Sequence, residues 1–413
     1  MTDPDPTTLL TTVIFALTYL GLAVGEVPGL RIDRAGIALV GAAAVLATGV
    51  LPLPDAARAV DYQTIVLLFS MMVVVAYLNL CGFFALATET IAERFSAPLP
   101  LLATVICISG FLSAFLVNDV VCVAMTPLVV SLCRRLGRPP APYLIGLATA
   151  SNVGSVATIT GNPQNIIIGS LSEISYLRFC LRLAPIALAC LLLTFIIVAW
   201  VYRRQLAPQA AGEPALRPRL IHVHRPLLTK SVFVTLATVA LFFAGHSITL
   251  VALAAAGVMM LSRTRPVKIY RAVDWPLLVM FTGLFVVVHA FEVNVVHSWG
   301  LERWQSLRQS PVVMVSALSV ALSNLVSNVP AVLLFKPLIE VIPQQEQAWL
   351  ALSMSSTLAG NLTLLGSVAN LIVVESARRS GANISFLEYL KVGVPLTLLT
   401  TLLGVAWLAG TSY

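Results

Sequence analysis

The chain has 413 residues, of which 58% are hydrophobic and only 10% are charged. Soluble globular proteins carry about 25% charged residues, so this composition excludes a soluble globule and predicts an all-α polytopic membrane protein. The net charge of +7 comes from short basic runs between apolar segments, where lysine and arginine orient a protein in the membrane. Because no basic face carries interleaved aromatic residues, we expect no nucleic-acid partner.

Apolar segments of about 20 residues, the length that crosses a lipid bilayer, recur along the chain. Residues 1–8 contain no lysine or arginine, so we expect the first span to be retained rather than cleaved as a signal peptide. The first part of the chain predicts spans at 9–27, 35–53 and 62–86, an interfacial amphipathic helix at 87–97, a hairpin at 99–132, a broken helix at 143–168 and a closing span at 183–202.

The hairpin is predicted because the apolar stretch 99–132 is interrupted at Val117, Asn118 and Asp119. Neither arm alone is long enough to cross a bilayer comfortably. We therefore expect a re-entrant hairpin whose tip is at Asn118.

The next apolar segment, 147–168, is interrupted by Gly154, Gly161 and Pro163. Unwound backbone at membrane depth is tolerated only where it faces protein or a water-filled cavity. Broken helices of this kind build the binding sites of transporters. The segment therefore predicts a binding site inside the membrane.

A polar linker rich in proline, alanine and arginine, 203–228, divides the chain into a first repeat, 1–202, and a second repeat, 229–413. About ten transmembrane spans are expected in total, with two re-entrant hairpins and two broken helices. The second half predicts spans at 231–245, 249–261 and 275–291, an amphipathic stretch at 292–309, a hairpin at 311–342 with its tip at Ser327 and Asn328, a second broken helix and a final span at 392–409.

The two halves resemble each other in sequence, which strengthens the span assignment. The predicted elements give five membrane crossings in each half. Because five is an odd number, the second repeat is expected to be inverted relative to the first. An Arg-Ala-Val-Asp motif at 58–61 recurs at 271–274. Other matched pairs are Asn118 with Asn328, Ser151 with Ser356, Thr158 with Thr363, Gly161 with Gly366 and Asn165 with Asn370.

The charge distribution predicts the orientation. If each hairpin returns to the side it entered from, most lysines and arginines fall on one side, which the positive-inside rule makes cytoplasmic. Both termini are then expected outside the cytoplasm, and the two hairpins are expected to enter the membrane from opposite sides. The expected membrane is the cell inner (plasma) membrane. The other side holds only Arg58, Arg178, Arg182, Arg303 and Arg308.

In each hairpin an asparagine is followed nine residues later by a proline, and the broken helices carry NVGSVATITGNPQN and AGNLTLLGSVAN. This combination resembles the ion transporter superfamily of divalent anion symporters, citrate transporters, arsenite efflux pumps and Na+/H+ antiporters. The resemblance covers nearly the whole chain and implies that the tips contact an anionic substrate and that tips and breaks bind Na+, often in a homodimer. The family's Ser-Asn-Thr tips are replaced here by Val117-Asn118-Asp119, which is similar to the arsenite branch, and by Ser327-Asn328-Val329. The GNPQN motif of the first break is similar to the anion permease branch, so the chain most resembles a bacterial anion permease in its motifs.

Asp119 is the one acidic residue of 18 that the predicted spans place at mid-membrane. Acidic groups at that depth serve ion paths, proton relays or ion pairs, so Asp119 is predicted to bind the coupling ion, H+ or Na+. The alternative is a structural hydrogen bond at the hairpin tip. Lys336 is interpreted as a snorkelling residue, with a cation facing the substrate as the alternative.

The predicted site combines the tips with the breaks. An asparagine beside a break can instead cap exposed backbone, and small residues can serve helix packing. No cofactor and no transition metal are expected. The predicted substrate-binding residues are Asn118, Asn165, Ser327, Asn328, Asn370, Thr158 and Thr363, and the predicted coupling-ion residues are Asp119, Asn118, Ser151, Asn152, Gly161, Asn328 and Gly366.

A secondary transporter accounts for the repeat, the breaks and the midplane acid together. We predict an ion-coupled symporter that moves a small anion, either a carboxylate or an inorganic oxyanion, by alternating access; the alternative is an arsenite/proton or Na+/H+ antiporter. The Walker motif and H-E-x-x-H are both absent, so an enzyme is not expected, and ATP coupling would need a separate ATPase subunit, as in the arsenite branch. A channel is the third class, but it does not require two pseudo-symmetric halves.

Overall fold

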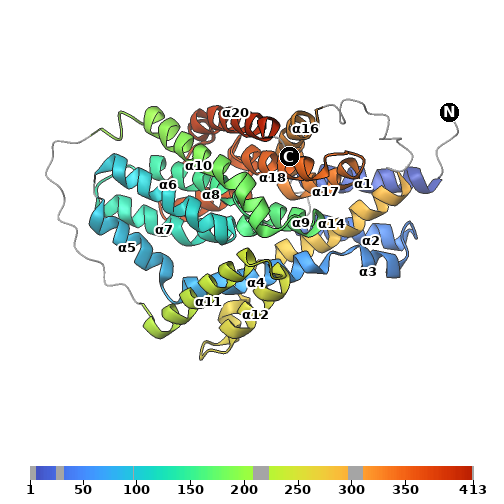
Figure 1. Cartoon of the computed structure of the whole chain (residues 1–413), viewed down its shortest axis with the longest axis horizontal. Helices are drawn as coiled ribbons and strands as arrows, with labels where there is room; N and C mark the ends of the chain where they lie inside the picture. The colour runs from blue at the N-terminus through green and yellow to red at the C-terminus, as the bar shows by residue number, and fades with distance from the viewer. Residues whose placement is uncertain (1–5, 25–31, 96, 208–222, 296–309, 412–413) are drawn as a thin grey trace.

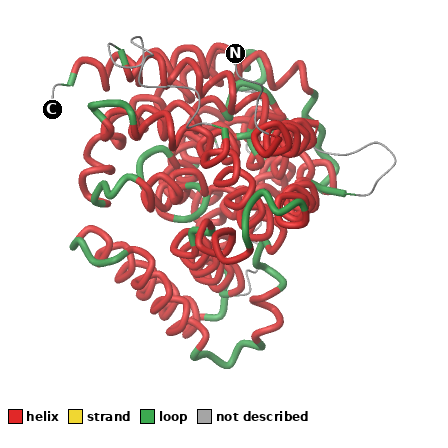
Figure 2. The backbone as a smooth tube through the Cα atoms, turned by 90° about the vertical axis from the view of Figure 1, so that its right-hand side faces the viewer, coloured by secondary structure: helices red, strands yellow, loops and turns green. Residues whose placement is uncertain are grey.

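The computed structural model describes residues 6–24, 32–95, 97–207, 223–295 and 310–411. Within these ranges every regular element is an α-helix or a 3-10 helix and no strand occurs (Figure 2). Among the same residues, seven helices are long and apolar enough to cross a membrane, and three shorter apolar helices accompany them. The expected all-helical, multi-pass class is therefore confirmed.

The helices follow the predicted order in the first half of the chain, with one short addition, α3. The elements are α1 (Pro6–Val24), α2 (Arg34–Ala47), α3 (Leu53–Ala59), α4 (Tyr62–Leu80), α5 (Phe83–Arg94), α6 (Pro98–Phe115), α7 (Asn118–Arg135), α8 (Ala141–Ser155), the 3-10 helix η1 (Ile159–Gly161), α9 (Pro163–Leu171) and α10 (Tyr176–Val201).

The second half repeats this order, with α13 as its short addition. Its elements are α11 (Arg225–Phe243), α12 (Ile248–Met260), α13 (Pro266–Tyr270), α14 (Trp275–Asn294), α16 (Pro311–Val326), α17 (Asn328–Glu340), α18 (Gln345–Ala359), the 3-10 helix η4 (Leu364–Gly366), α19 (Val368–Arg379) and α20 (Phe386–Gly410). The predicted amphipathic stretch 292–309 overlaps the end of α14, and most of it lies outside the described residues.

Two expectations about individual helices need correction. The predicted span 62–86 is two helices, because Gly82 adopts a φ of 87°, which ends α4 and turns the chain into α5. The first arm of the first hairpin, α6, has 18 residues and is apolar enough to cross a membrane. The argument that neither arm is long enough is therefore wrong for α6, since the helix starts directly at Pro98 and continues without a polar break to Phe115.

The two halves are interlocked rather than side by side. The second helix of each half packs against the third long helix of the other, so that α14 contacts α2 and α4 contacts α12. The second arm of each hairpin likewise contacts the last part of the other half's broken helix: α7 packs against α19, and α17 packs against α9. In Figure 1, α5 to α7 lie at one end of the long axis and α1 to α3 at the other, with α8, α9 and α18 between them.

Helices α6 and α8 approach each other closely at a pair of glycines. A Cβ atom at Gly154 would lie 2.0 Å from the backbone oxygen of Gly110, well inside van der Waals contact. Only glycine fits at this crossing. The close approach holds the first hairpin directly against the first broken helix.

Candidate functional site

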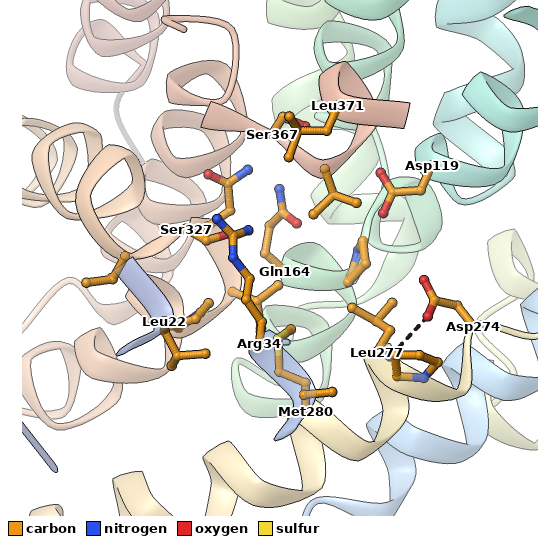
Figure 3. Close-up of a pocket in the computed structure, with 18 of the residues that line it drawn as sticks. Leu22, Arg34, Asp119, Gln164, Asp274, Leu277, Met280, Ser327, Ser367 and Leu371 are labelled. Atoms are coloured by element: carbon orange, nitrogen blue, oxygen red, sulfur yellow. Dashed lines mark hydrogen bonds between the residues drawn. The ribbon is translucent and has the colours of Figure 1, made fainter. Parts of the chain in front are cut away.

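A cavity of about 520 Å³ lies where the two hairpins meet the broken helices (Figure 3). In the described part of the chain, its polar lining comes from the amino termini of α2, α7, α9, α14, α17 and α19. The polar and charged lining residues are Asp33, Arg34, Asn118, Asp119, Gln164, Asp274, Ser327, Asn328 and Ser367.

The first backbone N–H groups of a helix have no partner inside the helix and carry a partial positive charge. Four of the converging helices are capped by a side chain: Asp33 accepts from the N–H of Gly36, Asn162 from Asn165, Asp274 from Leu277, and Ser367 from Ala369. Helices α7 and α17, which begin at the two hairpin tips, have no side-chain cap. Their N–H groups are therefore the ones left open to a ligand, as in other anion sites at helix amino termini.

The tip of the second hairpin is strained. Ser327, between α16 and α17, has a φ of 79°, a left-handed conformation that side-chain-bearing residues rarely adopt. Its counterpart region at the first tip, Leu116 and Val117, has ordinary extended backbone. Backbone strain of this type is often found at ligand sites, so the conformation of Ser327 makes the second tip a candidate ligand-binding position.

The polar and charged lining residues differ in their exposure to solvent. Asp33 and Asp274 are exposed at the mouth of the cavity, Arg34 and Asp119 are half-buried, and Asn118 and Asn328 are buried. Figure 3 shows Asp119 and Asp274 on one side of the cavity and Arg34 on the other, where its side chain extends toward Ser327 and Gln164. Asp119 makes no hydrogen bond or ion pair with another described residue.

The hairpin-tip asparagines present unpaired acceptors. Asn118 is 3% exposed and Asn328 is 8% exposed, and the Oδ1 atom of each is buried without a hydrogen-bond partner among the described residues. The Nδ2 atom of Asn118 donates to Oδ1 of Asn152 at 3.1 Å. A buried carbonyl-type oxygen without a donor is a suitable ligand for a hard cation such as Na+.

Asn152 connects the two halves through hydrogen bonds behind the cavity lining. Its Nδ2 atom donates to Oδ1 of Asn361 at 2.9 Å and of Asn370 at 3.1 Å, while its Oδ1 atom accepts from Ser367 Oγ at 3.0 Å. It also accepts from Asn118, so the first tip, the first break and the second break share one hydrogen-bond network. The network holds the breaks in register, and Asn361 is a member that the sequence reasoning missed.

Asn165 and Asn370 have the same role in their respective halves. The Nδ2 atom of Asn165 donates to the carbonyl oxygens of Ser155 and Thr158, both at 3.0 Å. That of Asn370 donates to Gly360 at 2.8 Å and Thr363 at 3.2 Å, at the same sequence spacing. Both asparagines therefore cap the unwound backbone, and neither lines the cavity.

The remaining predicted residues also support the breaks from outside the cavity. Ser151 shares a hydrogen bond of 2.8 Å with Ser113 Oγ and donates to the carbonyl oxygen of Asn118 at 3.2 Å. The hydroxyl of Thr158 donates to the carbonyl oxygen of Ala114. A Cβ atom at Gly161 would lie 2.2 Å from the carbonyl oxygen of Ser155, so the tight turn of the break requires glycine there. Thr363 and Gly366 occupy the corresponding turn before α19.

The structure thus brings Asn118, Asp119, Ser327 and Asn328 together in one cavity. Sequence reasoning missed several further lining groups, among them Arg34, Asp274 and Gln164. A signal existed for two of them, since Asp274 ends the repeated Arg-Ala-Val-Asp motif and Gln164 is part of the Gly-Asn-Pro-Gln-Asn break. Arg34 was counted only among the cations of a loop.

Neither Lys336 nor a cluster of metal-ligating side chains contributes to the described part of the cavity. Lys336 does not face the cavity; its Nζ atom lies 3.2 Å from Glu292 Oε1 on α14. The described residues contain no group of three or more His, Cys, Asp and Glu side chains that could hold a metal ion. The polar chemistry of the cavity therefore comes from amides, helix amino termini, one guanidinium and carboxylates.

Comparison with known proteins identifies the family of the chain. The family model described as CitMHS, citrate transporter, matches residues 13–359. The silicon efflux transporter LSI3 of Oryza sativa subsp. japonica is 29% identical over 97% of this chain and 97% of its own length. The putative transporter arsB of Dictyostelium discoideum is 25% identical over 91% and 87%, respectively.

A solved structure shares the fold. The YdaH transporter of Alcanivorax borkumensis, described as having an unusual topology, superposes with a TM-score of 0.60 at 16% identity, covering 98% of this chain and 97% of that one. At this identity the similarity extends to the fold alone. The family model, however, matches most of the chain, including both hairpins and the first broken helix. The chain therefore belongs to the citrate transporter family CitMHS and is a multi-pass membrane transporter rather than an enzyme.

Proposed function

We propose that this protein is an ion-coupled secondary active transporter that moves a small anion, a carboxylate or an inorganic oxyanion, across the cell inner membrane. The observation that carries the proposal is the convergence of helix amino termini on one cavity between the two halves, with the tips of α7 and α17 left uncapped. Partial positive charge from helix ends favours an anion without placing many fixed cations in the membrane.

Alternating access follows from the arrangement of the halves. The pairs α6–α7 and α16–α17 act as re-entrant hairpins that belong to two inverted repeats and enter from opposite sides. The uneven lysine and arginine distribution supports an orientation with both termini outside the cytoplasm and with Arg34 and Asp274 on the cytoplasmic side. Because the cavity mouth is formed beside Asp274, this conformation is the inward-open state.

Coupling depends on Asp119 and the two tip asparagines. A cation, H+ or Na+, binds at Asp119, and the unpaired Oδ1 atoms of Asn118 and Asn328 provide further ligands if the cation is Na+. Neutralising the carboxylate removes its repulsion of an anion at the uncapped helix ends. Cation binding thereby raises the affinity for the anion, which is the thermodynamic basis of symport.

A second candidate is favoured by the excess of acids in the cavity. Three aspartates, Asp33, Asp119 and Asp274, and a single arginine line the described part of it, which disfavours a cargo of high negative charge. A neutral, weakly acidic hydroxide of a metalloid would bind there and compete with protons, giving efflux by exchange. The names of the rice and Dictyostelium relatives, a silicon efflux transporter and a putative arsB transporter, support this candidate.

Flux measurements in proteoliposomes test both candidates. Purified protein is reconstituted under an imposed Na+ or proton gradient, and uptake of citrate, succinate, sulfate, phosphate, arsenite and silicic acid is measured against protein-free liposomes. Symport predicts uphill accumulation of one anion, driven by the inward gradient of Na+ or protons. Exchange predicts that arsenite or silicic acid moves in the direction opposite to the protons. If no cargo moves and neither gradient is dissipated, by cargo or by Na+/H+ exchange, the proposal is refuted.

A further inference from the structure

The most unusual group in the cavity is Arg34, the first residue of α2. A cation at a helix amino terminus faces the positive end of the helix dipole, so this position is locally unfavourable for arginine. The preceding residue, Asp33, caps the helix by accepting from the N–H of Gly36, and it forms no ion pair with Arg34. A local disadvantage that is not offset by a neighbouring contact is typical of a functional residue.

Arg34 also differs from several other cations of the described residues, because none of these residues pairs with it. Its guanidinium is half-buried, yet it makes no hydrogen bond or ion pair with another residue in the described part of the chain. Several other cations are paired with acids: Arg58 with Asp55, Arg135 with Glu89, Arg178 with Glu346 and Lys336 with Glu292. Arg34 lines the cavity, and its guanidinium donors have no acceptor among the described residues.

The surroundings of Arg34 suit one end of an elongated or branched oxyanion. Figure 3 shows the side chain reaching toward Ser327 at the strained second tip and Gln164 at the first break. Gln164 is held in place, since its Nε2 atom donates to Thr357 Oγ1 at 3.2 Å. Asp119 and Asp274 lie across the cavity, so an anion at Arg34 is separated from both carboxylates.

The second half has no equivalent of this arginine. The residues that begin α12, the helix corresponding to α2, are Ser247 as the cap and Ile248 as the first helical residue. In an inverted-repeat transporter the opposite access state would therefore expose a cavity without a cation at this position. The asymmetry makes Arg34 a group that acts in the conformation described here.

We propose that Arg34 is a cargo-binding residue that holds one carboxylate or inorganic oxyanion group through paired guanidinium hydrogen bonds, in the access state in which α2 and α14 line the open cavity. The proposal deepens the proposed function, on which its transport consequence rests. A planar guanidinium forms two parallel hydrogen bonds to an oxyanion, which the ammonium group of lysine cannot do. The residue therefore sets both affinity and preference for anionic over neutral cargo.

Binding to detergent-purified protein tests the assignment without requiring transport. Dissociation constants for citrate, succinate, sulfate and phosphate are measured by thermal-shift titration at constant Na+ concentration, constant ionic strength and one acidic pH. The proteins compared are the wild type, Arg34→Gln, Arg34→Lys and the control Arg58→Gln, whose side chain is 83% exposed. Because Arg34 has no hydrogen-bond or ion-pair partner among the described residues, Arg34→Gln is expected to keep or raise the melting temperature of the anion-free protein.

We expect Arg34→Gln to weaken binding of the preferred anion by about tenfold or more, as for loss of a charge-assisted bidentate contact, Arg34→Lys to lie between, and Arg58→Gln to match the wild type. Equal dissociation constants in wild type and Arg34→Gln, or no binding of any of these anions to the wild type, would overturn the assignment. Binding as expected without any flux in proteoliposomes supports Arg34 and refutes the transporter proposal. Flux with an unchanged KM in Arg34→Gln supports the transporter proposal and refutes the assignment of Arg34.

Discussion

Replacing Asp119 by asparagine separates the folding role of this residue from its role in coupling. The carboxylate forms no hydrogen bond or ion pair with another described residue, so the substitution breaks no such contact within the described part of the chain. Its one favourable structural interaction is with the amino terminus of α7, which is worth about 0.3–1 kcal/mol. We therefore expect Asp119→Asn to insert and fold with a melting temperature close to that of the wild type.

The effect on ion dependence is much larger. An anionic group of the cargo bound at the uncapped amino terminus of α7, about 4 Å from Asp119 and opposite the group held by Arg34, would be repelled by about 4 kcal/mol at an effective dielectric constant of 20, roughly a thousandfold in affinity. In the wild type this penalty is removed only when H+ or Na+ binds. In Asp119→Asn it is absent at every ion concentration, so anion binding should become tight and independent of pH and Na+.

The assay is a titration of anion binding at several pH values and Na+ concentrations, combined with gradient-driven flux. Under symport, Asp119→Asn binds the anion without ion dependence and loses uphill transport. Under exchange of a neutral cargo for protons, the variant binds cargo without competition by protons and again loses coupled transport. Wild-type coupling together with wild-type ion dependence in Asp119→Asn would refute the reasoning for both mechanisms.

Three further substitutions test the supporting structure. Asn370→Ala removes two donations to backbone carbonyls and one acceptor for Asn152, so we expect a loss of about 2–4 kcal/mol in the free energy of unfolding, seen as a lower melting temperature; an unchanged value would exclude the capping role. Gly154→Ala forces a methyl group into the backbone of Gly110, so we expect a loss of about 1–3 kcal/mol or more and a smaller monodisperse peak in size-exclusion chromatography, whereas wild-type behaviour would contradict the close helix crossing. Lys336→Met leaves Glu292, whose side chain is 14% exposed, without its ammonium partner, so we expect a loss of about 1–3 kcal/mol in the free energy of unfolding. Adding Glu292→Gln should reverse part of this loss in thermal unfolding, and no loss in Lys336→Met would show that the pair is not structural.

Much of the framework could be predicted from the sequence because it depends on local chemistry. The lengths of apolar segments predict the helices, and glycine and proline inside them predict the interruptions. The repeated order of elements and the tip asparagines Asn118 and Asn328 followed from comparing the two halves. The two hairpin tips and the two helix breaks lie where the sequence predicted them.

The roles of individual polar residues were less predictable. Asn165 and Asn370 share their motif with residues at the cavity, yet they face away from it and cap the unwound backbone. An asparagine near a break can do either, since its amide binds a carbonyl oxygen and a ligand equally well. The direction of the side chain, which depends on the path of the break, decided between the two.

The sequence by itself determined the membrane class, the order of the helices and the positions of the hairpin tips and breaks, because hydrophobicity and helix interruption act over one or two turns of chain. Only the tertiary structure decided which charges share the cavity. Arg34 and Asp274 are far apart in the sequence and belong to different halves, and they meet Asp119 because α2 packs against α14 while α7 packs against α19. Contacts between helices so distant along the chain depend on the packing of whole surfaces, which no local pattern of residues specifies.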